Sequence, residues 1–84
     1  MKLEPELEQI LNRAPQANVA VIVHVQGDPT SYTGLIEAFG LFVARVFRLT
    51  NTLAVHGAAS GVLQLADQPW VVKIESDRQI TTQR

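Results

Sequence analysis

Two closely spaced carboxylates near the end of the chain are the side chains best placed to do chemistry. Glu75 and Asp77 follow the apolar run Trp70 to Ile74. A carboxylate pair can act as general acid and base, but no third polar group accompanies this pair in the sequence, and neighbouring positions at a strand end rarely form a cleft. Taken alone, the pair is typical of solvated carboxylates, and the sequence predicts no enzyme.

The other reactive side chains also favour structural roles. His24 and His56 lie in predicted strands without a carboxylate or cysteine beside them in the sequence, which predicts packed or surface histidines and no metal site. Ser60 stands at a predicted helix start, so we expect an N-cap and not a nucleophile. The run Gly57 to Gly61 lacks the lysine and the spacing of a phosphate-binding loop. The sequence therefore predicts no cofactor.

Composition narrows the class of protein further. The 84 residues are 46 % hydrophobic and 18 % charged, which is typical of one globular domain. A net charge of −1 with scattered basic residues gives no field that would attract nucleic acid. No apolar run approaches the roughly 20 residues of a membrane span, and there is no signal-peptide pattern. We expect a cytoplasmic protein if the sequence is complete, and an extracellular one if it was cut from a secreted precursor.

The periodicity of apolar residues predicts an N-terminal helix followed by six elements. The helix covers residues 4–13, with one apolar stripe formed by Leu3, Leu7, Ile10 and Leu11. The six elements are a strand over 18–26, a helix over 30–39, strands over 41–49 and 52–56, a helix over 60–67 and a strand over 70–75. Asp28 or Thr30 is the expected N-cap of the 30–39 helix, and Gly40 its C′ residue.

This order, βαββαβ, predicts an α+β protein with a ferredoxin-like, four-stranded antiparallel sheet. Both helices of the βαββαβ unit should cover one face of the sheet, with the N-terminal helix as an addition. We therefore divide the chain into an N-terminal helical extension (1–17), the ferredoxin-like domain (18–77) and an extended C-terminal tail (78–84).

The sheet face without helices is more apolar than a solvated face needs to be. In the first strand, Ala20 and Ile22 lie on that face beside His24. In the second strand, simple alternation places Phe42, Ala44 and Val46 on it, and Val43, Phe47 and Leu49 on the opposite face. Either the N-terminal helix or a partner should cover such a face. The N-terminal helix has two other roles open to it, which are to pad the core edge or to pair with another chain.

From Val55 to Asp77 the sequence resembles the subtilisin propeptide family, which includes free-standing protease inhibitors. The family pattern, L-A-x-x-P-x-V followed by an apolar pair and E-x-D, is matched by Leu65, Ala66, Pro69, Val71, Ile74, Glu75 and Asp77. Upstream, VAVIVHV, the pair Phe39-Gly40 and the segment VFRLTNTLAV are similar to the family's strand, glycine and hairpin. The resemblance covers residues 19–83, and the N-terminal helix lies outside it.

The resemblance implies a non-enzymatic inhibitor, or folding chaperone, of a subtilisin-like serine protease. In that family the helix-free sheet face docks on two parallel helices of the protease, which here implies contacts from Ile22, Phe42 and Ala44. The family's E-x-D carboxylates accept hydrogen bonds from the N-termini of those helices. Glu75 and Asp77 match them, and free N–H groups with a positive dipole suit such a role.

The resemblance also implies that the C-terminal tail lies in the protease's substrate cleft as a product-like peptide. Counted from Asp77, the register makes Gln83 the P1 residue, Thr82 P2, Thr81 P3 and Ile80 P4. The branched apolar Ile80 suits the apolar P4 preference of subtilisin clefts. Arg84 extends one residue beyond this register, and the sequence leaves open whether Gln83 or Arg84 is P1.

A second class of function stays open at the level of the residues. Ferredoxin-like regulatory and assembly domains pair their sheets edge to edge or face to face, and fold alone does not imply function. The apolar sheet faces would suit such a homodimer as well. We expect an inhibitor to be monomeric when free, and an assembly domain to be dimeric.

Overall fold

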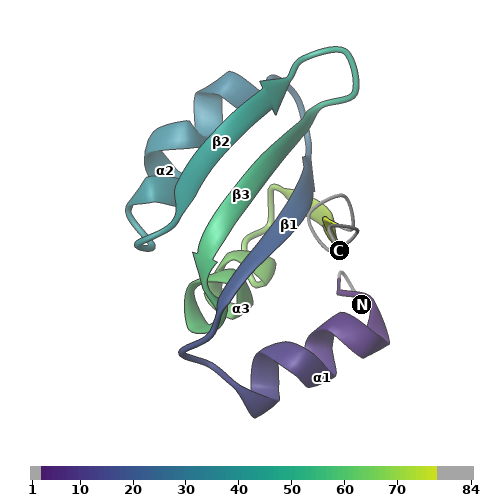
Figure 1. Cartoon of the computed structure of the whole chain (residues 1–84). Helices are drawn as coiled ribbons and strands as arrows, with labels where there is room; N and C mark the ends of the chain where they lie inside the picture. The colour runs from purple at the N-terminus through teal and green to yellow at the C-terminus, as the bar shows by residue number, and fades with distance from the viewer. Residues whose placement is uncertain (1–2, 78–84) are drawn as a thin grey trace, which may run out of the picture.

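A computed structural model describes residues 3–77 of the chain (Figure 1). Its elements are α1 (Pro5–Arg13), β1 (Asn18–Val25), the 3-10 helix η1 (Pro29–Tyr32), α2 (Thr33–Glu37), β2 (Phe42–Phe47), β3 (Thr52–Ala58), α3 (Ala59–Ala66) and β4 (Val71–Ser76). The predicted α+β class and the four-stranded antiparallel sheet are confirmed. The division of the chain into three parts at residues 17 and 77 stays a prediction.

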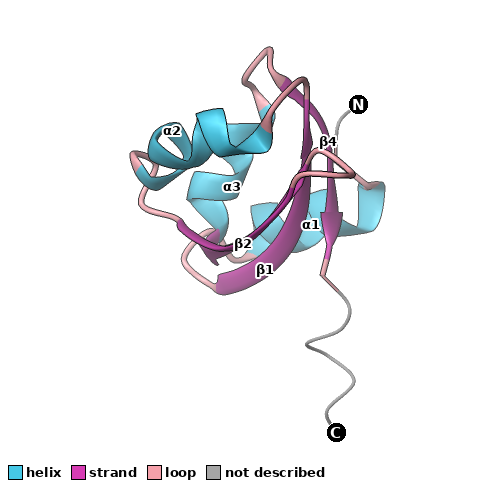
Figure 2. Cartoon of the chain, turned by 90° about the horizontal axis from the view of Figure 1, so that it is seen from above, coloured by secondary structure: helices cyan, strands magenta, loops and turns pink. Residues whose placement is uncertain are grey.

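The sheet has the strand order β2-β3-β1-β4, and each neighbouring pair is antiparallel. The β-branched run of β1 pairs with β3 on one side and β4 on the other. Val21, for example, lies opposite Val55 of β3 and Ser76 of β4. Figure 2 shows α2 and α3 together on one side of the sheet. Because the side chains of a strand alternate between its faces, every second residue of β1 points toward these helices.

The hydrophobic core lies between the helices and the facing side of the sheet. Its buried side chains come from all three α-helices, from strands β1, β3 and β4, and from the segments that flank them. They are Leu3, Leu7, Leu11, Val21, Val23, Val25, Ile36, Leu41, Leu53, Val55, Ala59, Val62, Leu65, Val71 and Ile74. Burying each of the larger ones stabilises the fold by roughly 1.5 to 3 kcal/mol before conformational entropy is subtracted.

The N-terminal helix α1 is part of this core. The helix begins at Pro5, one residue after the predicted start, and Leu7 and Leu11 are buried in the core cluster. α1 packs against α3, and Leu3 forms an isolated parallel bridge with Ile74 at the β4 edge. Of the three roles open to this helix, padding the core edge is the one the structure supports. Ile10, the remaining residue of the predicted stripe, is 53 % exposed.

The segment after β1 is capped as expected but is not one continuous helix. The predicted helix over 30–39 is divided into η1 and α2. Asp28 is the N-cap: the Thr30 hydroxyl and the Thr30 backbone N–H donate to its Oδ1 at 2.8 and 3.0 Å. These two bonds, with a smaller contribution from Arg48, hold the pKa of Asp28 below its ordinary value. Gly40 has the positive φ of 82° typical of a glycine after a helix, but α2 ends at Glu37 with Ala38 as its C-cap, so Gly40 lies one position beyond the C′ position that the sequence predicts for it.

The predicted N-cap role of Ser60 is wrong. α3 begins at Ala59, its N-cap is Ala58, and no side chain caps it. The backbone N–H groups of Ala59 and Ser60 donate instead to the carbonyl oxygens of Ala17 and Pro15, each at 2.9 Å. The loop between α1 and β1 therefore satisfies the free N–H groups of the first turn. A contact between segments so far apart in the chain leaves no local signal in the sequence.

The predicted faces of the second strand are partly wrong because β2 contains a bulge. The register with β3 shifts between Val43 and Arg45, so one residue of β2 is left over. After the shift Val46 lies opposite the core residue Leu53, and Phe47 lies opposite Thr52. A bulge reverses the alternation beyond it. Phe47 is therefore on the helix-free side, where simple alternation placed Val46.

Candidate functional site

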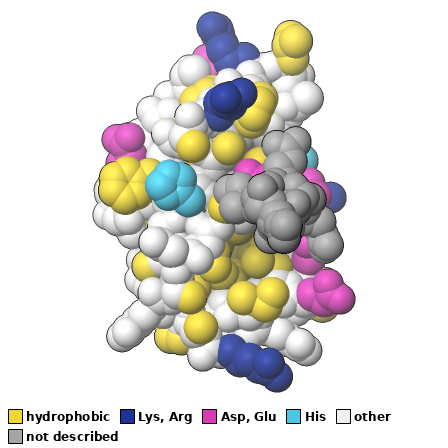
Figure 3. Space-filling model, in the orientation of Figure 1, with side chains coloured by type: hydrophobic (Ala, Val, Ile, Leu, Met, Phe, Trp, Pro, Cys, Tyr) yellow, Lys and Arg dark blue, Asp and Glu magenta, His cyan; other side chains and the backbone are white. Residues whose placement is uncertain are grey.

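The side of the sheet that faces away from α2 and α3 carries the candidate site, and we call it the open face. A hollow of about 480 Å³ lies on it. It is lined by Ile22, Ala44, Arg45, Phe47, Ala54, Ser76 and Asp77. Figure 3 shows this face, with hydrophobic side chains gathered over the strands and continuing toward α1. The lining is mixed: four apolar side chains are joined by Arg45, Ser76 and the carboxylate of Asp77.

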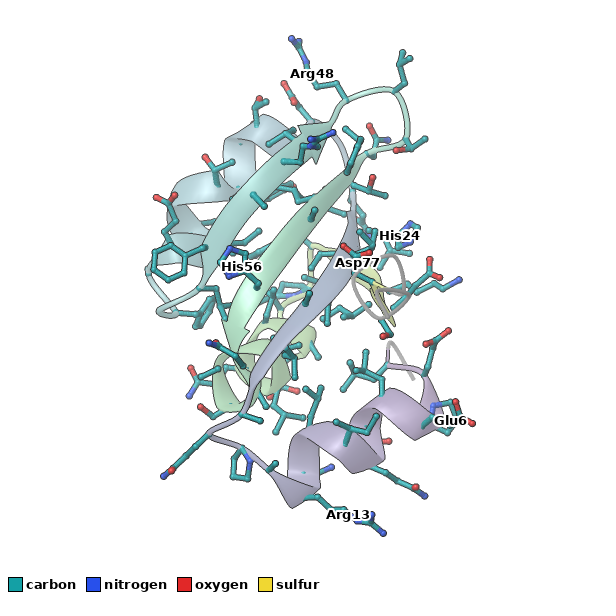
Figure 4. The ribbon with its side chains drawn as sticks, in the orientation of Figure 1. Glu6, Arg13, His24, Arg48, His56 and Asp77 are labelled. Atoms are coloured by element: carbon teal, nitrogen blue, oxygen red, sulfur yellow. The ribbon has the colours of Figure 1, made fainter. Side chains whose placement is uncertain are left out.

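The structure brings two of the three predicted face contacts together. Ile22 from β1 and Ala44 from the bulge of β2 both line the hollow. Phe42 lies on the same face but outside the lining, where it is 64 % exposed. Its ring stacks on His56 with the centroids 5.3 Å apart, and Figure 4 shows His56 over β3. His56 thus has the surface role that the sequence predicts.

Glu75 lies on the open face, opposite Ile22 in the register of β1 and β4. Its Oε2 atom is 2.5 Å from Nε2 of His24 and 3.8 Å from Nζ of Lys73. The sequence places no carboxylate next to His24, but the folded chain brings Glu75 against it. His24 and Glu75 are 51 positions apart in the sequence, and only the pairing of β1 with β4 brings them together.

Both of these contacts use the same oxygen of Glu75. In the described residues no hydrogen bond is made to the other oxygen, Oε1. The Glu75 side chain is also about one-third exposed. The arrangement leaves Oε1 able to accept a hydrogen bond from outside the molecule.

Asp77 stands where the chain leaves the sheet. Its backbone N–H donates to the carbonyl oxygen of Ala20 at 3.0 Å, directly after the last residue of β4. Asp77 and Ser76 line the hollow of the open face and also a second hollow of about 240 Å³. The other residues lining this second hollow are Leu7, Ile10, Asn18, Val19 and Ala20.

The predicted tail contacts lie outside the described residues. They are Ile80, Thr81, Thr82 and Gln83, and the choice of P1 between Gln83 and Arg84 lies there too. Within residues 3–77, no three His, Cys, Asp or Glu side chains form a group that could hold a metal ion. None of the helices in that range is long and apolar enough to cross a membrane.

Sequence reasoning missed several residues of the site, namely His24, Arg45, Phe47, Ala54, Lys73 and Ser76. The predicted alternation did place His24 beside Ile22 on the correct face. It could not give the register between β1 and β4, which decides that His24 meets Glu75. The positions of Arg45 and Phe47 on the open face depend on the bulge in β2. No glycine or proline in that strand indicates the bulge from the sequence.

Comparison with known proteins identifies no family for this chain. No protein-family model and no curated protein matches it. The family assignment therefore stays a prediction that rests on the resemblance described above.

Proposed function

We propose that this chain is an inhibitor, a folding chaperone, or both, of a subtilisin-like serine protease. We further propose that its fold is ferredoxin-like, with α1 added at one edge. The strand order β2-β3-β1-β4 with antiparallel neighbours supports the ferredoxin-like assignment. The sequence resemblance supports the choice of partner. Neither inhibition nor chaperone activity of this kind requires a catalytic group in the chain.

One observation carries the proposal. The hollow of the open face, the two carboxylates and the end of the strand at Asp77 all lie at one end of β4. A surface that combines exposed apolar side chains with a few polar and charged groups is typical of a protein-binding site. A chain that leaves at Asp77 can continue into the partner without turning back over its own core.

Docking would use three kinds of contact. Ile22 and Ala44 would meet the apolar surface of the protease, with Phe42 at the border. Glu75, through Oε1, and Asp77 would accept hydrogen bonds from the N-terminal turns of protease helices, where free N–H groups and the helix dipole favour anions. Ile80 to Gln83 would lie in the substrate cleft and exclude substrate from it. Inhibition would then be competitive, and the folded domain would slow cleavage and release of the tail.

Truncation tests the role of the tail. A chain ending at Asp77 should keep its fold and lose much of its affinity for a subtilisin, measured as the inhibition constant. Equal inhibition by the truncated and full-length chains would contradict the tail mechanism. Sedimentation of the free chain tests the alternative, because an inert dimer would favour an assembly domain that pairs through its sheet.

A matched pair of substitutions tests the role of the open face. Ala44 is exposed and lines the hollow, whereas Leu49 is exposed beyond the end of β2 and does not. Ala44→Glu should weaken inhibition at least about ten-fold, because docking would bury an unpaired charge. Leu49→Glu places the same charge away from the hollow and should change the inhibition constant little. Equal effects of the two substitutions would exclude the hollow from the interface.

A further inference from the structure

The second hollow lies between α1 and the start of β1, next to the open face. Its apolar lining comes from Leu7 and Ile10 of α1 and from Val19 and Ala20 of β1. Leu7 is buried in the core, whereas Ile10 is half exposed and its side chain borders the hollow. A half-exposed isoleucine on a short helix contributes little to the stability of its own fold. It would contribute more if a partner covered it.

The two hollows are adjacent at the end of β4, because Ser76 and Asp77 line both of them. In Figure 3 the hydrophobic side chains likewise extend from the strands toward α1. A partner seated around Asp77 would therefore meet both surfaces.

The expected position of the cleft favours that contact. In the proposed function Ile80 occupies the P4 subsite, and Ile80 is three residues after Asp77. Three extended residues span at most about 10 Å. A cleft rim that holds Ile80 would then lie within that distance of Asp77, which also lines the crevice of Ile10 and Val19.

We propose that this crevice, which we call the α1 crevice, is a second contact site for the protease and takes an apolar side chain from the cleft rim. The proposal rests on the proposed function. It assigns a binding role to α1, which lies outside the region that resembles the propeptide family. Ile10 would be its central contact because its exposed surface becomes covered only in the complex.

Two neighbouring substitutions on α1 separate this role from a general effect of charge. Gln9 is exposed on the same helix but does not line the α1 crevice. We expect Ile10→Glu to weaken inhibition of a subtilisin at least about ten-fold, because the complex would bury the new charge. Gln9→Glu should stay within about two-fold of the wild-type constant, since exposed charges contribute little. Thermal unfolding of both variants, followed by Trp70 fluorescence, checks that each remains folded.

The possible outcomes distinguish failure of this proposal from failure of the function. If the wild-type chain inhibits and the two variants inhibit equally, the α1 crevice is not a contact site, while the proposed function stands. If the wild-type chain does not inhibit any subtilisin tested, the proposed function fails and the crevice loses its partner. If Ile10→Glu dissociates a dimer of the free chain in sedimentation, the crevice binds a second copy and the proposal is overturned.

Discussion

Leu11→Ala is the most direct test of whether α1 belongs to the fold. Leu11 is fully buried in the core, whereas its neighbour Ile10 is 53 % exposed on the same helix. If α1 packs as described, the two positions should respond very differently to the same truncation. If α1 were a detachable extension, neither substitution would affect the unfolding of the rest of the chain.

The expected loss follows from the burial of each side chain. Replacing a fully buried leucine by alanine removes its transfer free energy and leaves a cavity, at a cost of about 3 kcal/mol. Ile10→Ala removes a half-exposed side chain and should cost no more than about 1 kcal/mol. An 84-residue domain has a total stability of roughly 4 to 13 kcal/mol, so the Leu11 loss is a large part of it.

Urea and thermal unfolding measure the difference. The chain has a single tryptophan, and Trp70 packs against the core and stacks on Tyr32 with ring centroids 4.4 Å apart. Its fluorescence should therefore report loss of the core. For a domain of this size we expect the Tm of Leu11→Ala to fall by roughly 12 to 24 °C, and that of Ile10→Ala to fall far less.

Equal responses at positions 10 and 11 would contradict the packing of α1 described above. If the two substitutions changed the free energy of unfolding by the same amount, or if Leu11→Ala cost less than about 1 kcal/mol, α1 would not share the core. The N-terminal helix would then contribute little to the free energy of unfolding of the domain.

Two further predictions concern stability. Gly57→Ala should destabilise the fold by about 1 to 3 kcal/mol, because a Cβ there would lie 2.7 Å from Cδ2 of Leu41 and the φ of 152° disfavours L side chains. Gly34→Ala is the control: no atom lies within 4 Å of its Cβ, and the substitution should stabilise α2. Equal effects of the two substitutions in urea unfolding would contradict this packing. The lowered pKa of Asp28, caused by the Thr30 hydroxyl and N–H, means that its carboxylate adds stability above the ordinary aspartate pKa, and that this contribution is lost as pH falls through the folded value. Asp28→Ala should therefore be less stable than the wild type at neutral pH, by a margin that shrinks in acid, and a margin constant with pH would exclude the capping carboxylate as its cause.

The candidate site shows where prediction from the sequence reached its limit. The open face could be predicted because Ile22 alternates with the core valines of its strand. Ala44 could be placed there because apolar residues occur on both faces of the second strand. The partner of Glu75 could not, since His24 lies 51 positions away and meets it only through the register of two strands. Arg45 and Phe47 depend on a bulge, which is a property of the pairing between β2 and β3 and not of β2 alone.

Local patterns in the sequence predict the order of the strands and main helices, a turn at Gly40, a cap at Asp28 or Thr30, and exposed apolar residues on the open face. These features arise from alternation, helical spacing and turn residues, which act over a few neighbouring positions. Three features depend on the tertiary fold. The carbonyl oxygens of Pro15 and Ala17 cap α3, His24 contacts Glu75, and the two hollows meet at Asp77. Each of these is a contact between distant segments. Its geometry is set by packing and strand register, which no local pattern encodes.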